Sequence, residues 1–148
     1  MDESNPIGRT DFVLATLSLL KEGSTFSPVQ VQKLFFLLDR EIPEKISGPR
    51  FTFSPYDYGP FDVDVYRELE ALSRTQCVEI LQGNGHRLYR LSDTGRARGN
   101  KIAALLDTSA REYIENAGNF VLRLNFKQLV TSIYKSYPEM KAKSIFQE

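Results

Sequence analysis

The sequence is short of the residues that most catalytic and metal sites need. Its 148 residues include a single cysteine, Cys77, a single histidine, His86, and no tryptophan. One cysteine excludes an internal disulfide and a cysteine-cluster metal site, and one histidine removes most metal sites and catalytic triads. We therefore expect no catalytic residue, no metal and no cofactor, and a binding protein rather than an enzyme.

Long apolar runs and a charge imbalance are also missing. No apolar run approaches the roughly 20 residues of a membrane span, and the acidic N-terminus does not resemble a secretory signal. Lysine plus arginine and aspartate plus glutamate each number 19, so the formal net charge is zero. Overall charge cannot hold such a chain to DNA, and a nucleic-acid surface would require local segregation of charge. We expect a cytoplasmic protein without a membrane partner.

The remaining composition is that of an ordinary globular domain. Hydrophobic residues make up 41% of the chain and charged residues 26%, and the length suits one core. We predict a single domain over residues 1–148, divided into a flexible lead-in at 1–9, a core at 10–106 and a C-terminal helical extension at 107–148. The predicted fold class is α+β, mainly α.

Apolar periodicity predicts six helices and a β-hairpin. The helices are expected at about 10–22, 28–40, 63–73, 93–106, from the Asp107–Ser109 break to 123, and at 126–137. Strands are expected at 50–54, 78–81 and 88–91. The second helix has a clear start, with Ser27 as N-cap, Pro28 at the first position and Gln30 completing a capping box.

Helical spacing also predicts which side chains are buried. The second helix carries a wide apolar stripe, and its polar residues Gln32, Lys33 and Asp39 are expected to face outward. The buried side of the fourth helix is expected to consist of Ala97, Ile102, Leu105 and Leu106.

Residues 62–98 resemble a winged-helix domain. Two helices, a strand, a helix, a two-stranded hairpin and a further helix follow one another in the order of that fold. The segment Tyr89-Arg-Leu-Ser-Asp-Thr-Gly-Arg-Ala97 after the hydrophobic strand Cys77–Ile80 is similar to the wing pattern of bacterial MarR-like and PadR-like regulators. Those proteins usually have glycine before the first wing strand, where a left-handed C-cap is needed, whereas this chain has Gln76.

A second resemblance covers residues 28–146. The stretches Lys33-Leu-Phe-Phe-Leu-Leu-Asp39, Tyr58-Gly-Pro-Phe61 with Val65-Tyr66, and Ile133-Tyr-Lys-Ser-Tyr-Pro-Glu-Met140 look like the SocA-like antitoxin domain, also called Panacea. The resemblance implies a small prokaryotic interaction domain of the kind encoded beside toxins or in defence loci. It carries no catalytic residues over to this chain.

The leading hypothesis is an antitoxin-like or defence-associated protein that binds a protein partner. Tyr56, Asp57, Asp64 and Arg67 form the predicted contact face, because tyrosine provides large contact area at a small entropic cost. Residues 62–73 contain four acids and one base, which opposes insertion into a DNA groove. Tyr58 and Phe61 are expected to pack beneath the wing.

The alternative hypothesis is a DNA-binding transcriptional regulator. Its phosphate contacts would come from five basic residues in and after the wing: Arg87, Arg90, Arg96, Arg98 and Lys101. The same charges are also compatible with a solvated hairpin and helix face. A homodimer through the two C-terminal helices is possible in this scheme.

Two further chemical interpretations have little support in the sequence. Cys77 borders an apolar strand with only Arg74 as a nearby base, which predicts an inert, partly buried thiol. Asp57 and Asp62 could form a carboxylate pair, but the sequence offers no histidine or third acid at a spacing suited to a metal.

Overall fold

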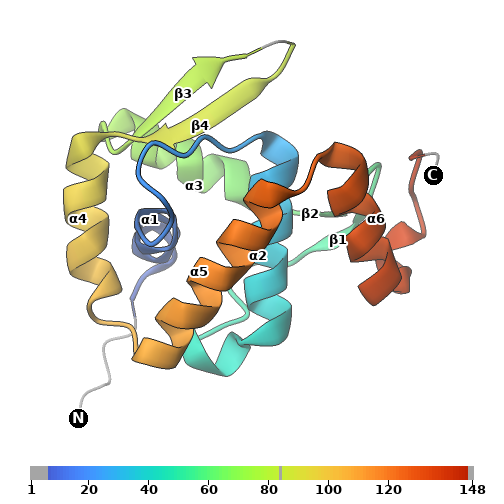
Figure 1. The fold of residues 1–148 in the computed structure, drawn as a ribbon, viewed down its shortest axis with the longest axis horizontal. Coiled ribbons are helices and arrows are strands. Elements are labelled where there is room, and N and C mark those ends of the chain that lie inside the picture. The colour runs from blue at the N-terminus through green and yellow to red at the C-terminus, as the bar shows by residue number, and fades with distance from the viewer. Residues whose placement is uncertain (1–6, 84, 147–148) are drawn as a thin grey trace.

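The computed structural model describes residues 7–83 and 85–146, which form six α-helices and two antiparallel β-hairpins (Figure 1). The helices are α1 (Arg9–Ser18), α2 (Pro28–Glu41), α3 (Val63–Arg74), α4 (Asp93–Ala103), α5 (Thr108–Arg123) and α6 (Phe126–Ser136). The strands are β1 (Ser54–Tyr56), β2 (Gly59–Phe61), β3 (Val78–Gln82) and β4 (Arg87–Leu91). The α+β, mainly helical class is confirmed. The predicted lead-in lies partly outside the described residues, as do Asn84 of the wing turn and residues 147–148.

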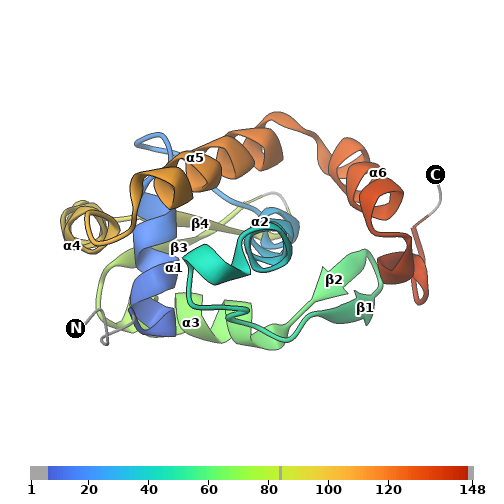
Figure 2. The same ribbon diagram turned by 90° about the horizontal axis from the view of Figure 1, so that it is seen from below.

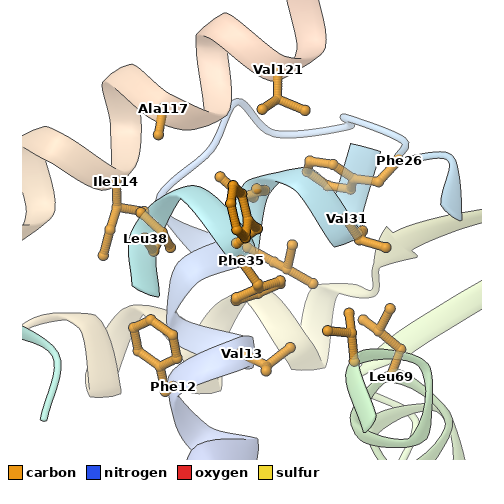
Figure 3. Packing of buried hydrophobic residues seen from close by; sticks show 14 of the residues in the cluster. Phe12, Val13, Phe26, Val31, Phe35, Leu38, Leu69, Ile114, Ala117 and Val121 are labelled. Carbon is orange, nitrogen blue, oxygen red and sulfur yellow. The ribbon is translucent and has the colours of Figure 1, made fainter. Parts of the chain in front are cut away.

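Helix α2 is the centre of the fold, with α1, α3 and α5 around it (Figure 2). Its predicted start is confirmed, because the Ser27 side chain accepts from the Gln30 amide and the Gln30 side chain accepts from the Ser27 amide. Phe35 meets Phe12 of α1 edge to face at 5.9 Å, and Figure 3 shows Leu38 and Ile114 of α5 closing the same core. None of the described helices has both the length and the apolar character needed to cross a membrane.

The polar residues of α2 are buried, and the prediction that they face outward was wrong. Gln32, Lys33 and Asp39 lie within the protein because the connection between α2 and α3 covers them. The Asp39 carboxylate accepts from the amides of Arg50 at 2.7 Å and Phe51 at 2.9 Å. The Gln32 side chain exchanges two 3.0 Å hydrogen bonds with the Asp62 backbone. These side chains fasten the connection to α2.

The connection contains a hairpin that the sequence did not predict. Of the strand expected at 50–54 only Ser54 lies in a strand, since Phe51 and Phe53 precede β1 and their rings pack edge to face on Phe35 and Phe36 of α2. Strand β1 pairs with β2 in the register Ser54↔Phe61. Pro55 and Pro60 stand opposite each other in this two-stranded hairpin, where proline is tolerated because both strands are edge strands.

Helix α4 makes its closest contacts through glycines, and of the four residues predicted to be buried only Ile102 and Leu106 pack, partly buried, against the core. Its buried positions are Gly95, Gly99 and Ala103, whereas Ala97 is exposed and Leu105 lies beyond the helix end. A Cβ on Gly95 would stand 1.9 Å from the Cys77 carbonyl oxygen, and one on Gly99 would stand 2.7 Å from Ser18 Cβ. The absence of side chains allows α4 to lie directly against α1 and the start of β3.

The wing hairpin is tied to the helical body by a backbone bridge. Its register is Val78↔Leu91, with Glu79 opposite Arg90. The amide and carbonyl of Tyr89 in β4 pair with the carbonyl and amide of Phe26, both at 2.9 Å. The predicted hairpin is therefore confirmed, and its second strand is attached to the segment that precedes α2.

Helix α3 ends in a left-handed C-cap formed by a non-glycine residue. Gln76 has a φ of +65°. The Cys77 amide bonds to the Leu72 carbonyl at 2.8 Å and the Gln76 amide to the Ser73 carbonyl at 3.0 Å, which is the hydrogen-bond pattern of a Schellman motif. The backbone thus adopts the conformation for which the MarR-like pattern uses glycine.

Gln76→Gly is expected to stabilise the protein by about 0.5–1 kcal/mol, because glycine adopts the left-handed conformation without the steric penalty of a Cβ. Urea unfolding at equilibrium measures the change. The control is Thr75→Gly at the neighbouring position, where φ is −98° and glycine should lower stability. A loss of stability in Gln76→Gly would contradict this explanation.

Candidate functional site

The β1–β2 hairpin lies beside α6 and the C-terminal end of the described chain (Figures 1 and 2), and these segments carry four exposed apolar side chains. Tyr56, Tyr58, Phe126 and Ile145 are 52%, 38%, 44% and 59% exposed. The rings of Tyr58 and Phe126 meet at 5.1 Å, and the Ile145 amide donates to the Asp57 carbonyl at 2.9 Å. We call these four residues the aromatic patch. A grouped apolar surface of this kind is typical of an interaction site.

Tyr58 and Phe61 of the β1–β2 hairpin do not both lie where the sequence predicted. Tyr58 does not lie beneath the wing, because it turns toward α6 and contacts Phe126. Phe61 is half-buried and stacks on Tyr56 at 4.8 Å. Its ring also meets Tyr66 at 5.6 Å, and Tyr66 stacks on Tyr89 of the wing at 6.4 Å. Phe61 thus reaches the wing indirectly, through Tyr66.

The four predicted protein-binding residues fall into two pairs. Tyr56 is exposed as expected, and Asp57 beside it is half-buried. Asp64 and Arg67 form an ion pair of 3.0 Å on the first turns of α3, and Asp64 also lies 3.5 Å from Arg9 of α1. Only the first pair lies at the aromatic patch.

A cavity of about 150 Å³ lies beside the patch. Its aromatic lining consists of Tyr56, Tyr58, Phe61 and Tyr66, and its polar lining of Gln32, Lys33 and Asp57. Lys33 is only 3% exposed. Among residues 7–83 and 85–146 its amine makes one hydrogen bond, to the Pro60 carbonyl at a long 3.4 Å. Burial lowers the pKa of the Lys33 ammonium to about 7. The amine is therefore poorly compensated at the place where the cavity forms.

Glycine is required at position 59, next to this amine. Gly59 has a φ of +104°, in the region that side chains disfavour. A Cβ there would stand 3.2 Å from Tyr134 Cε1 and 3.6 Å from Lys33 Nζ. Tyr134 is buried, and its hydroxyl has no hydrogen-bond partner among residues 7–83 and 85–146. The Lys33 amine and the Tyr134 ring thus both lie close to Gly59.

Most of the predicted DNA-binding arginines are engaged within the protein. Arg87 pairs with Glu70 of α3 at 3.4 Å, and Arg90 with Glu79 across the wing at 2.8 Å. Arg96 donates to the Ser18 and Leu20 carbonyls at 3.0 and 3.3 Å, which fixes the end of α1. These contacts give the basic residues structural partners and reduce the charge that the wing offers to phosphate.

The remaining candidates also have structural surroundings. Cys77 is fully buried. Its cationic neighbour is Arg98 of α4, which donates to Sγ at 3.1 Å, and not Arg74. Lys101 is exposed on α4. The Asp62 carboxylate accepts from the amides of Asp64 at 2.9 Å and Thr52 at 2.7 Å, and the described residues include no cluster of three or more potential metal ligands.

A larger groove of about 420 Å³ lies between α5 and α6. Tyr113 and Phe120 of α5 and Ile133 of α6 line it together with Leu37 of α2. These are the helices through which the sequence predicted a homodimer, and that prediction remains a proposal.

No protein-family model, no curated protein and no solved structure matches the chain. Function therefore has to be inferred from the geometry of the patch, the cavity and the wing.

Sequence reasoning missed Lys33 and Phe126 as functional candidates. Lys33 lies between Val31 and the run Leu34, Phe35 and Phe36, and a helix segment that is apolar on nearly every side leaves few solvent-facing positions for its polar residues. That pattern is the signal that could have identified it. Phe126 occupies the first position of α6, where local sequence gives no indication of what it will contact.

Proposed function

We propose that this protein is a prokaryotic binding module, antitoxin-like or defence-associated, that contacts a protein partner through the aromatic patch. The observation that carries the proposal is the grouping of Tyr56, Tyr58, Phe126 and Ile145 on one surface. Tyrosine and phenylalanine are enriched in the cores of protein interfaces, where they bury large areas with few rotatable bonds.

The resemblance to the SocA-like domain supports the same function. Three stretches that carry the resemblance converge in space, since the Lys33 amine contacts the Pro60 carbonyl and Gly59 lies against Tyr134. We propose a winged-helix description because α3, β3, β4 and α4 follow one another in the order of that fold. In that description the acids of α3 and the bases of the wing partly neutralise one another through the Glu70–Arg87 pair, which favours a protein partner over DNA.

Phe126→Ser combined with Ile145→Ser is expected to weaken binding of the natural partner by about thirtyfold or more, the effect of losing an aromatic contact at the centre of an interface. The partner is recovered by affinity capture from the source cells and then titrated against purified variants. The matched control, Arg87→Ser with Arg90→Ser, changes the wing and should bind as the wild type does.

The regulator alternative makes the opposite prediction. A partner lost from the wing variant and retained by the patch variant would contradict the proposal. So would specific binding to duplex DNA at low salt that weakens steeply as salt is raised, since that dependence marks contacts to phosphate.

A further inference from the structure

The cavity beneath Tyr56 has the composition of a small anion site. Lys33 is the only cationic side chain and Asp57 the only acid among the described residues that line it. The neighbouring Gln32 side chain is engaged by the Asp62 backbone and by Tyr66. The Lys33 ammonium can donate three hydrogen bonds, and within the described part of the chain it makes one, of 3.4 Å. A buried cation with this little compensation is unfavourable unless an anion joins it.

The size of the cavity and its walls limit the anion. A volume of about 150 Å³ corresponds to roughly five water molecules at ~30 Å³ each, which accommodates a carboxylate with a few attached carbons. The rings of Tyr56, Phe61 and Tyr66 provide apolar surface for those carbons. Phosphate, which is surrounded by polar oxygens on every side, would leave most of them against aromatic carbon without hydrogen bonds.

We propose that this cavity is a binding site for a carboxylate group attached to a small apolar body, which Lys33 holds as an ion pair between the aromatic rings. No ion pair joins Lys33 to a carboxylate of the described residues. The site borders the aromatic patch, since Tyr56 and Tyr58 belong to both, and its ligand is either a free acid or an acidic side chain of another polypeptide.

Binding is coupled to protonation of the amine. The pKa of Lys33 in the free protein is about 7, so the amine is mostly neutral at higher pH and must take up a proton to pair with an anion. The other titratable groups at the cavity are Asp57 and the tyrosines at 56, 58, 66 and 134. Burial raises the pKa of the Tyr66 hydroxyl above its ordinary value, so this hydroxyl stays neutral in the range where Lys33 releases its proton.

Sodium benzoate titrated into the whole protein, followed by amide NMR shifts, tests the site. We expect saturable shifts centred on residues 56–61, an affinity that falls about tenfold per pH unit above about pH 7, and no binding of the uncharged analogue benzamide. Lys33→Met should lose the binding. Asp57→Asn should strengthen it, because it removes the repelling charge. N-acetylglutamic acid amide, a side-chain mimic, is titrated in parallel.

The outcomes separate the two sources of the carboxylate. Tighter binding of benzoate assigns the site to a free acid, and tighter binding of the glutamate mimic assigns it to a partner's side chain. The inference is overturned if neither compound binds saturably, if Lys33→Met binds equally well, or if affinity is independent of pH. The protein contact is tested separately with Phe126→Ser and Ile145→Ser, which lie outside the cavity lining.

Discussion

Lys33→Met is expected to raise the free energy of unfolding by about 2–4 kcal/mol at about pH 6. Burial lowers the pKa of Lys33 from 10.5 to about 7, and each unit corresponds to about 1.4 kcal/mol. Keeping the charged amine buried therefore opposes folding by several kcal/mol. Methionine fills most of the same space without a charge, and the lost 3.4 Å contact to Pro60 offsets only about 1 kcal/mol. Urea unfolding of both proteins measures the difference.

The same experiment has a distinctive pH dependence. Unfolded Lys33 holds its proton up to 10.5, whereas folded Lys33 releases it near 7, so the unfolded chain binds more protons between these values and wild-type stability rises with pH. Above about pH 10 the trend reverses, because burial raises the pKa of Tyr66 and Tyr89 and the unfolded chain then releases protons first. Lys33→Met should lack the rise between about pH 7 and 9.

The control is Lys101→Met, the same substitution at an exposed lysine of α4. It should leave both the stability at low pH and the rise with pH unchanged. If Lys33→Met proved less stable than the wild type at about pH 6, the Lys33 amine would have to be well compensated, and the carboxylate site would lose its physical basis.

Gly95→Ala is expected to destabilise the protein by about 3 kcal/mol or more. The added Cβ would stand 1.9 Å from the Cys77 carbonyl oxygen. That oxygen belongs to the backbone at the start of the wing and accepts a hydrogen bond from the Ser92 amide at 3.0 Å, so it cannot move aside as a flexible side chain would. Relief requires α4 to shift away from both α1 and the wing.

Thermal unfolding of Gly95→Ala, with Asn100→Ala as the control, tests the close approach of α4 to the Cys77 carbonyl. Asn100 is exposed on the same helix, and alanine there should be neutral or stabilising, since alanine has the higher helix propensity. A Gly95→Ala protein as stable as the wild type would mean that α4 does not lie against Cys77.

Much of the fold could be predicted because its signals are local. The start of α2 follows from Ser27, Pro28 and Gln30, and the side chains of Asp62 and Asn125 cap α3 and α6 in the same local way. Each signal acts within three or four residues, so a single sequence contains it.

The errors arose where distant segments decide the outcome. Lys33 and Asp39 look like a solvent-facing stripe until the connection at 42–62 folds over them. The glycines of α4 look like weak helix positions until α1 lies against Gly99. In the candidate site, Tyr56 could be predicted as exposed because it sits in a turn-rich stretch, whereas Tyr58 could not, because its neighbour Phe126 comes from a helix much later in the chain.

The bridge between Phe26 and Tyr89 also limits how copies of this protein can polymerise. An open strand edge presents unpaired amides and carbonyls that can recruit a strand from another molecule. The outward-pointing amide and carbonyl of Tyr89, in the middle of β4, are already taken by Phe26. Growth of an intermolecular sheet is therefore blocked at that edge and would have to begin along β3, where Glu79 places a charge that disfavours stacking of identical chains.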